Sequence, residues 1–342
     1  MKTSSFAARV LLTFAFAATA SAQSAVNTTK NYRGTIGDKH IEMRLLLSGN
    51  TLSGTYSYDQ FRQEIKLSGT VQSNGSLEFT ETAPKAKKPS AKFVCKPKPE
   101  TFEADVECDW SRLDGSGKAL AVFYEQFIDA GIEIAPKMIN DRASKITISY
   151  PQITNAIPAA EPFNALISGN VQKSVKEDFV PEKPGTGVFD GNYVVLFANP
   201  QFLSVEIQEY SDVGAAHPNT RFWTLNYDLK AQREVTLPEL FQEKSDYTGV
   251  IASYVASDIN RRAQQMDEDE AKRNGTKPEK REEPVITTDQ LPEIYAWGAT
   301  QKGLAIYFDF PHVMAVFDKT IVPYELLRPH LRSDGPIQLF VR

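Results

Sequence analysis

The feature that most constrains this fold is a series of short alternating segments in the first third of the sequence. Most of these segments place apolar residues at every second position, and Gly, Asn, Asp and Ser separate one segment from the next. Such alternation is typical of strands with one buried face, and the separating residues favour tight turns. We therefore predict an antiparallel β meander that forms a small barrel or curled sheet. The expected strands include residues 41–47, 52–58, 65–71, 77–80 and 119–127.

The two cysteines, Cys95 and Cys108, lie within this series. Residues 101–108 alternate strictly, and residues 96–100 hold two prolines that favour a turn. The two sulfurs would then face each other across a hairpin. Because catalytic pairs are usually spaced CxxC, we predict a structural disulfide, which stabilises by about 2–3 kcal/mol for so short a loop.

The amino terminus has the order of properties of a cleavable secretory leader. Lys2 and Arg9 accompany an apolar run at residues 10–18, and small residues follow at 20–22. The run is much shorter than the roughly 20 apolar residues that span a bilayer. We predict a signal peptide at residues 1–22 and an exported protein, periplasmic or extracellular in a bacterium. No later stretch is apolar enough to span, so we expect no membrane span in the mature chain.

The pattern of apolar residues changes in the second half of the sequence. Alternation is lost over residues 130–141, which we take as a join between an all-β domain (23–130) and a second domain (142–342). Apolar residues at helical spacing predict helices, and strands separate them, one of which should stop at Pro151. The mixed charges of residues 266–283 indicate a solvated, mobile helix end and loop. The second half is therefore α+β with a mostly antiparallel sheet. The expected helices cover 161–179 and 247–264, and the strands include 145–150, 202–210, 220–229, 295–297, 303–310 and 320–322.

Motifs with known chemistry are sparse. The sequence has no HExxH zinc pair, no GxSxG nucleophile elbow and no glycine-lysine phosphate loop, so we predict neither a cofactor nor a metal site. His217 stands out, because residues 214–219 combine small residues, a titratable ring and a proline. The candidate ligand-binding residues are His217, Asn219, Asp309 and His312. The ring of His217 could recognise a ligand or act as a base, or its nitrogens could bond backbone groups and fix the turn.

Several motifs of the second half occur in a familiar order. They are residues 150–153, 214–219 followed by 225–229, 237–241, and 303–308 followed by 322–326. In this order they resemble the RsiV-like extracytoplasmic domains, found in a lysozyme-sensing anti-sigma factor and in the noncatalytic region of the peptidoglycan deacetylase PdaC. The resemblance covers about residues 145–342. It implies an α+β fold, a bacterial envelope location and, in one branch of the family, lysozyme binding.

These observations favour a non-catalytic binding protein of the cell envelope. The expected ligand is lysozyme, another cationic protein or peptidoglycan. The net charge of −5 suits a cationic partner and disfavours nucleic acid. The alternatives are an envelope glycan hydrolase or deacetylase-associated module that uses His217, and a scaffold whose β domain positions the other domain.

Overall fold

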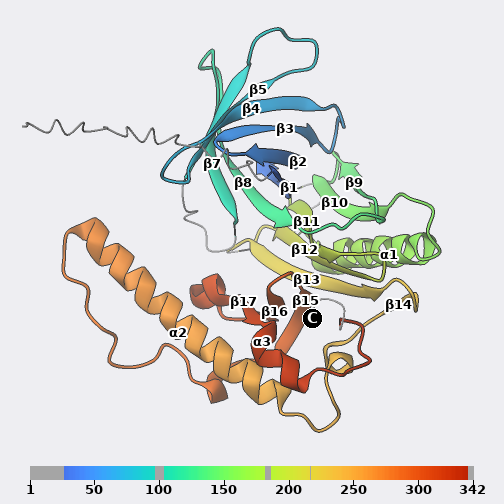
Figure 1. The fold of residues 1–342 in the computed structure, drawn as a ribbon, viewed down its shortest axis with the longest axis vertical. Coiled ribbons are helices and arrows are strands. Elements are labelled where there is room, and N and C mark those ends of the chain that lie inside the picture. Colours follow the sequence, from blue (N-terminus) through green and yellow to red (C-terminus); the bar gives the residue numbers. More distant parts are fainter. Residues whose placement is uncertain (1–26, 97–103, 182–185, 216, 338–342) are drawn as a thin grey trace, which may run out of the picture.

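Three sheets and two long helices make up the fold (Figure 1). The structure is a computed structural model, and it describes residues 27–96, 104–181, 186–215 and 217–337. The predicted signal peptide lies outside these residues. Within the described part, no helix is long and apolar enough to cross a membrane.

The first sheet is a closed barrel of eight antiparallel strands. Each strand pairs with the next along the chain, and the first closes on the last, with Gly34 opposite Phe123. This confirms the predicted meander and decides for a barrel over an open curled sheet. The strands are β1 (Asn27–Ile36), β2 (Lys39–Ser48), β3 (Thr51–Tyr58), β4 (Ile65–Val71), β5 (Leu77–Thr82), β6 (Ala91–Cys95), β7 (Val106–Arg112) and β8 (Lys118–Gln126).

Side chains fill the barrel. Phe79 and Phe93 stack with ring centroids 4.6 Å apart, and both rings are buried. The Tyr56 hydroxyl and the Trp110 Nε1 donate hydrogen bonds to Glu81, at 2.6 Å and 3.0 Å. An eight-stranded barrel leaves an interior just wide enough for such packing. The barrel interior is therefore a hydrophobic core with one satisfied buried carboxylate.

Glycine permits close strand contacts in this barrel. A Cβ at Gly34 would lie 1.9 Å from the Val122 carbonyl oxygen, and one at Gly54 would lie 2.1 Å from that of Arg44. Any other residue at either position would push neighbouring strands apart.

The predicted disulfide is present. Cys95 on β6 and Cys108 on β7 lie directly opposite each other in the strand register, and their sulfurs are bonded. The bridge therefore joins the two strands of one hairpin, as the alternation of residues 101–108 predicted.

The second sheet has six strands in the order β14-β13-β12-β11-β10-β9. All pairs are antiparallel except β10 with β11, which confirms the predicted α+β class. Helix α1 (Ala160–Asp178) connects this parallel pair. The strands are β9 (Ile134–Asp141), β10 (Ile146–Ile153), β11 (Val188–Ala198), β12 (Phe202–Asp212), β13 (Asn219–Asp228) and β14 (Arg233–Glu234).

Two local expectations were wrong around β9 and β10. The join expected at residues 130–141 contains strand β9, whose Ile134 and Ile139 pack against the core. Strand β10 also continues through Pro151. Because β9 is an edge strand and β10 pairs with β11 only as far as Ile148, prolines here lose few ladder hydrogen bonds.

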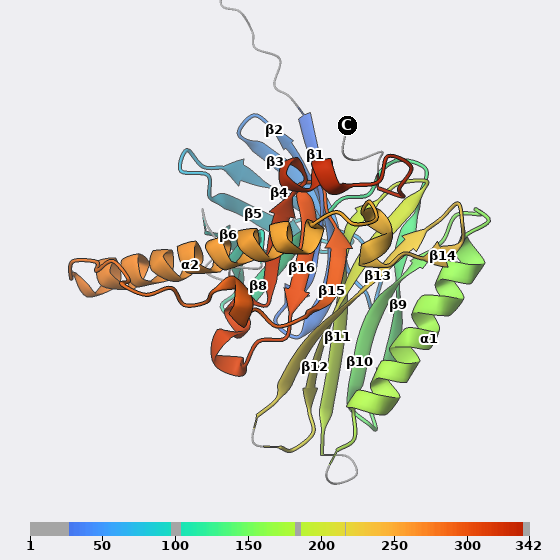
Figure 2. The same ribbon diagram turned by 90° about the horizontal axis from the view of Figure 1, so that it is seen from below.

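Two layers cover the six-stranded sheet on opposite faces (Figure 2). Helix α1 packs on one face through Phe163, Ile167 and Val171. The other face is covered by a three-stranded sheet, β15 (Ile294–Ala299), β16 (Gly303–Phe308) and β17 (Lys319–Pro323), on which helices α2 (Tyr247–Asn274) and α3 (Tyr324–Leu327) pack. Short 3-10 helices cover Leu237–Leu240, Thr288–Gln290, His312–Phe317 and Arg328–His330.

Helix α2 runs ten residues beyond its predicted end. Asp246 caps its first turn by accepting the Gly249 N–H at 3.1 Å, and Gly275, with φ of 66°, ends it in a left-handed conformation. The loop that follows folds back on the helix, where Arg281 pairs with Asp267. The charges of residues 266–283 thus form contacts along a helix rather than a fully solvated loop.

A buried polar joint holds the barrel against the six-stranded sheet. Arg33 of β1 is fully buried and pairs with Asp59, which follows β3. Its Nε donates to Asn192 of β11 at 3.1 Å, and its guanidinium lies 4.1 Å from the centre of the Tyr193 ring. One buried cation therefore contacts both sheets, which orients them relative to each other.

Candidate functional site

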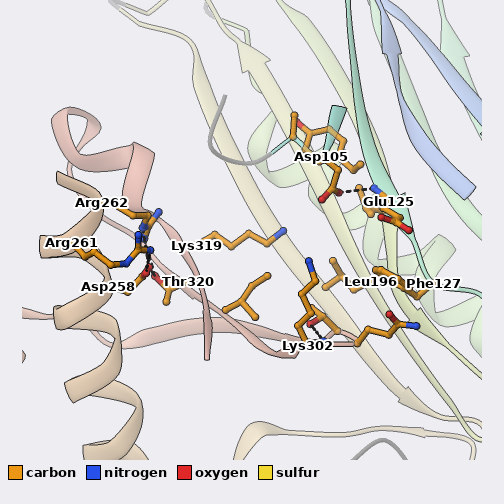
Figure 3. Close-up of a pocket in the computed structure, with 16 residues that line it drawn as sticks. Asp105, Glu125, Phe127, Leu196, Asp258, Arg261, Arg262, Lys302, Lys319 and Thr320 are labelled. Carbon is orange, nitrogen blue, oxygen red and sulfur yellow. Dashed lines mark hydrogen bonds and ion pairs between the residues drawn. The ribbon is translucent and has the colours of Figure 1, made fainter. Parts of the chain in front are cut away.

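A pocket of about 340 Å³ lies where the barrel, the six-stranded sheet and the layer of α2 and β17 meet (Figure 3). We call it the junction pocket. Val194 and Leu196 of β11 contribute to its lining together with charged residues from the barrel side and from the opposite side. A pocket formed by several elements, with apolar residues and a few polar groups, is the usual form of a ligand site.

The barrel side of the junction pocket is acidic. Asp105 lies just before β7, and its carboxylate accepts the Glu125 N–H at 2.7 Å. Glu125 in turn pairs with Lys30 at 2.8 Å. Removal from water and the nearby Glu125 carboxylate raise the pKa of Asp105, although Lys302 and Lys319 on the other side oppose this.

The opposite side of the junction pocket is basic, and ion pairs and hydrogen bonds hold most of its cations in place. On α2, Arg261 and Arg262 both pair with Asp258, at 2.6 Å and 2.9 Å. The Arg262 Nη2 also donates to the Thr320 hydroxyl of β17 at 2.9 Å. Arg262 therefore fastens α2 to β17, and its charge is already used within the protein.

Lys319 is also committed to a structural partner. Its ammonium donates to the buried Glu206 of β12 at 2.5 Å, and the Tyr307 hydroxyl donates to the same carboxylate. Burial opposes ionisation of Glu206, but the charge and hydrogen bond of Lys319 outweigh it and hold the pKa of Glu206 below its usual value.

Lys302 differs from these cations. It lies in the turn between β15 and β16, where the Thr300 hydroxyl accepts the N–H groups of Lys302 and Gly303, each at 3.1 Å. The backbone of this turn is thus well ordered by hydrogen bonds. The Lys302 side chain is exposed, and its ammonium makes no hydrogen bond or ion pair with the residues that the structure describes. It is available to a ligand.

The residues predicted from the sequence gather elsewhere, beyond the end of β16. His217 and His312 stack with ring centroids 6.1 Å apart and an angle of 12° between the rings. Asn219 and Asp309 line a neighbouring pocket of about 150 Å³. The described residues contain no group of three or more His, Cys, Asp or Glu side chains arranged to hold a metal ion. What these four residues bind stays a prediction.

The His217 ring is exposed, and its nitrogens have no hydrogen-bond partner within the described ranges. This observation gives no support to the alternative in which the ring fixes its own turn. Asp318 lines the same small pocket, and burial, with a contribution from Asp309, raises its pKa to about 6.

Sequence reasoning missed the junction pocket entirely. Lys302 lies far along the sequence from Asp105 and Glu125, and none of the three belongs to a motif. No local pattern could have identified them, because only the packing of the barrel against the second half brings them together.

Comparison with known proteins gives a partial match. No family model matches the chain. Over 151 residues, 44% of this chain, it is 22% identical to the peptidoglycan-N-acetylmuramic acid deacetylase PdaC of Bacillus subtilis. Part of this chain is similar to PdaC. The matched stretch covers 32% of the length of PdaC.

Two solved structures of DUF3298 family proteins also match. The one from Bacteroides fragilis has a TM-score of 0.41 and 14% identity, and covers 62% of this chain and 98% of its own. The one from Pseudomonas aeruginosa has a TM-score of 0.40 and 14% identity, and covers 60% of this chain and 96% of its own. The narrower assignment to RsiV-like domains stays a prediction.

Proposed function

We propose that this chain is a non-catalytic binding module of the bacterial cell envelope, and that its junction pocket holds a small zwitterionic ligand, such as a peptide of the cell wall. Two observations and one prediction from the sequence support the envelope. They are the partial similarity to a peptidoglycan deacetylase, the disulfide, which is typical of exported proteins, and the leader expected at residues 1–22.

The observation that carries the ligand class is the charge arrangement of the junction pocket. Asp105 and Glu125 line one side, and the free ammonium of Lys302 lies on the other. A ligand with an amine and a carboxylate can place the amine against the acidic side and the carboxylate on Lys302. Charge-assisted hydrogen bonds of this kind are stronger than neutral ones. Cell-wall stem peptides carry both groups.

Titration with the tripeptide L-Ala-γ-D-Glu-L-Lys, followed by calorimetry or NMR, tests this proposal. We expect wild-type protein to bind, and Lys302→Met to bind about tenfold more weakly, because one charge-assisted hydrogen bond contributes on the order of 1.5 kcal/mol. Lys230→Met, which changes an exposed lysine in the turn after β13, is the matched control and should bind as wild type does. Absence of binding by the wild type, or unchanged affinity of Lys302→Met, would contradict the proposal.

A cationic protein such as lysozyme is the second candidate ligand, favoured by the net charge of −5. Retention of lysozyme on immobilised protein at low salt, lost at moderate salt, is the expected result for this candidate. No retention at either salt concentration would eliminate it.

A further inference from the structure

We propose that a second pocket, at the other end of strand β11, binds an acidic saccharide. This pocket has a volume of about 570 Å³ and lies between the turn after β3, the turn that joins β9 to β10, and the start of β11. Asp190 of β11 contributes here, whereas Leu196 of the same strand lines the junction pocket. The two sites are therefore separate, and this proposal does not depend on the proposed function.

Exposed aromatic residues line the second pocket. Phe61 is 68% exposed, and Tyr210 is 40% exposed. The ring of Tyr58 meets that of Phe61 edge to face, with centroids 6.4 Å apart. Large aromatic residues left in water around a concavity mark a binding surface. The C–H face of a pyranose ring packs well on such rings while its hydroxyl groups stay available for hydrogen bonds.

The turn that carries Phe61 is held in place. The N–H groups of Phe61 and Arg62 both donate to the Tyr58 carbonyl, at 3.0 Å and 2.8 Å. The Arg62 guanidinium also donates to the carbonyl of Pro136 on β9. Phe61 is therefore presented on an ordered turn, and a ligand would lose little affinity to ordering it.

A carboxylate lines the second pocket. The Asp190 side chain is 39% exposed, and one of its oxygens lies 2.9 Å from Nε2 of the buried His40. The other ring nitrogen of His40 lies 3.1 Å from the Ser149 hydroxyl. The hydrogen bonds from Ser149 through His40 orient the Asp190 carboxylate. Its exposed part can accept hydrogen bonds from neighbouring sugar hydroxyls.

Arg142 and Lys145 supply positive charge to the second pocket, whereas Lys39, which also lines it, is paired with Asp38 at 2.8 Å. Arg142 and Lys145 lie on the turn between β9 and β10, whose shape is set by Asp141 accepting the Ala143 N–H at 2.9 Å. The side chains of Arg142 and Lys145 form no ion pair or hydrogen bond with residues that the structure describes. Because the Arg142 guanidinium matches the geometry of a carboxylate and Lys145 adds a second positive charge, these residues select a sugar that bears an acid group.

Titrations with N-acetylmuramic acid and N-acetylglucosamine, followed by NMR at millimolar concentration, test the assignment. The two sugars differ by one carboxylate-bearing lactyl group. We expect N-acetylmuramic acid to bind at least about fivefold more tightly, and the double variant Arg142→Met/Lys145→Met to bind both sugars equally. Failure of the wild type to bind N-acetylmuramic acid, or a preference that survives the double variant, would overturn the proposal.

Phe61→Ala tests the aromatic platform without touching the core. It should weaken N-acetylmuramic acid binding about tenfold. Leu113→Ala is the matched control, because Leu113 is an exposed apolar residue at another barrel hairpin, and it should leave binding unchanged. Lys302→Met should also leave it unchanged, and a loss in that variant would place the sugar in the junction pocket and overturn the assignment.

Discussion

His40 of the barrel and Asp190 of the six-stranded sheet form a hydrogen bond across the contact between the two, with Nε2 and Oδ1 2.9 Å apart. His40 is 4% exposed, and its carbonyl accepts the N–H of Asp59 at 3.1 Å, whose carboxylate pairs with the buried Arg33. A polar contact of this kind has defined directions, unlike apolar packing. It therefore sets the orientation of the barrel, on which both candidate pockets depend.

Arg33→Met should destabilise the protein by about 3–5 kcal/mol, because it leaves the Asp59 carboxylate buried without a partner. Urea denaturation measures this change. Arg44→Met, which alters an exposed arginine on the neighbouring strand β2, should stay within about 0.5 kcal/mol of wild type. The double variant Arg33→Met/Asp59→Leu should recover much of the loss. Equal stability of Arg33→Met and Arg44→Met would refute the role of the pair.

Replacing both cysteines by serine should lower the free energy of unfolding by about 3 kcal/mol, because the bridge closes a loop with a sequence separation of 13 residues in the unfolded chain. Urea denaturation with and without reductant checks this. Wild-type protein should respond to the reductant, and the double serine variant should not. If full reduction left the free energy of unfolding of the wild type unchanged, the prediction would be wrong.

Glu206 should make stability sensitive to acid. Its folded-state pKa lies below the unfolded value of about 4.3, so its ionised form contributes fully above that pH, and the contribution is lost as pH falls through the folded-state pKa. Urea denaturation between pH 7 and pH 3 should show a steeper acid decline for wild type than for Glu206→Gln. Glu243→Gln, at an exposed position, should follow the wild-type curve.

Asp318 should make the folded protein less stable as pH rises, which is the opposite of the effect of Glu206. Folding raises the pKa of Asp318 to about 6, from an unfolded-state pKa of about 3.9. The folded protein therefore favours the protonated carboxyl, and the free energy of unfolding falls as pH rises through this range. Asp318→Asn should therefore raise the melting temperature at pH 7 and leave it unchanged below pH 4. The gain should be less than about 1 kcal/mol, since the group is half exposed to solvent. A lower melting temperature at pH 7 would show that the carboxylate stabilises.

His217→Ala should leave stability within about 0.5 kcal/mol of wild type, because the ring is exposed. His40→Ala should cost about 1–3 kcal/mol, since it removes one hydrogen-bond partner of the buried Ser149 hydroxyl and one of Asp190. Thermal and urea unfolding of the two variants compare them directly. A large loss in His217→Ala would favour the alternative in which this ring fixes its turn.

Local patterns determined much of the fold. Short apolar runs separated by turn residues predicted the strands of the meander, and strict alternation at residues 101–108 predicted the facing of Cys95 and Cys108. Helical spacing after residue 160 predicted α1 to within a residue. These features depend on contacts between residues close in sequence. Where the pattern was interrupted, prediction failed: Pro136 and Pro151 look like strand breakers, but their positions in the sheet leave few hydrogen bonds to lose.

The sites depended on the tertiary structure. Sequence motifs predicted His217 and His312 as site residues, and the fold brings their rings together. The fold also forms two pockets that no sequence motif predicted. Lys302 and Asp105 share a pocket only because the barrel is oriented on the second half by buried polar bonds. Periodicity reports which face of an element is buried and says nothing about which distant element covers it. The directional contacts of Arg33 and His40 decide which element covers that face, and no pattern in the sequence predicted these contacts.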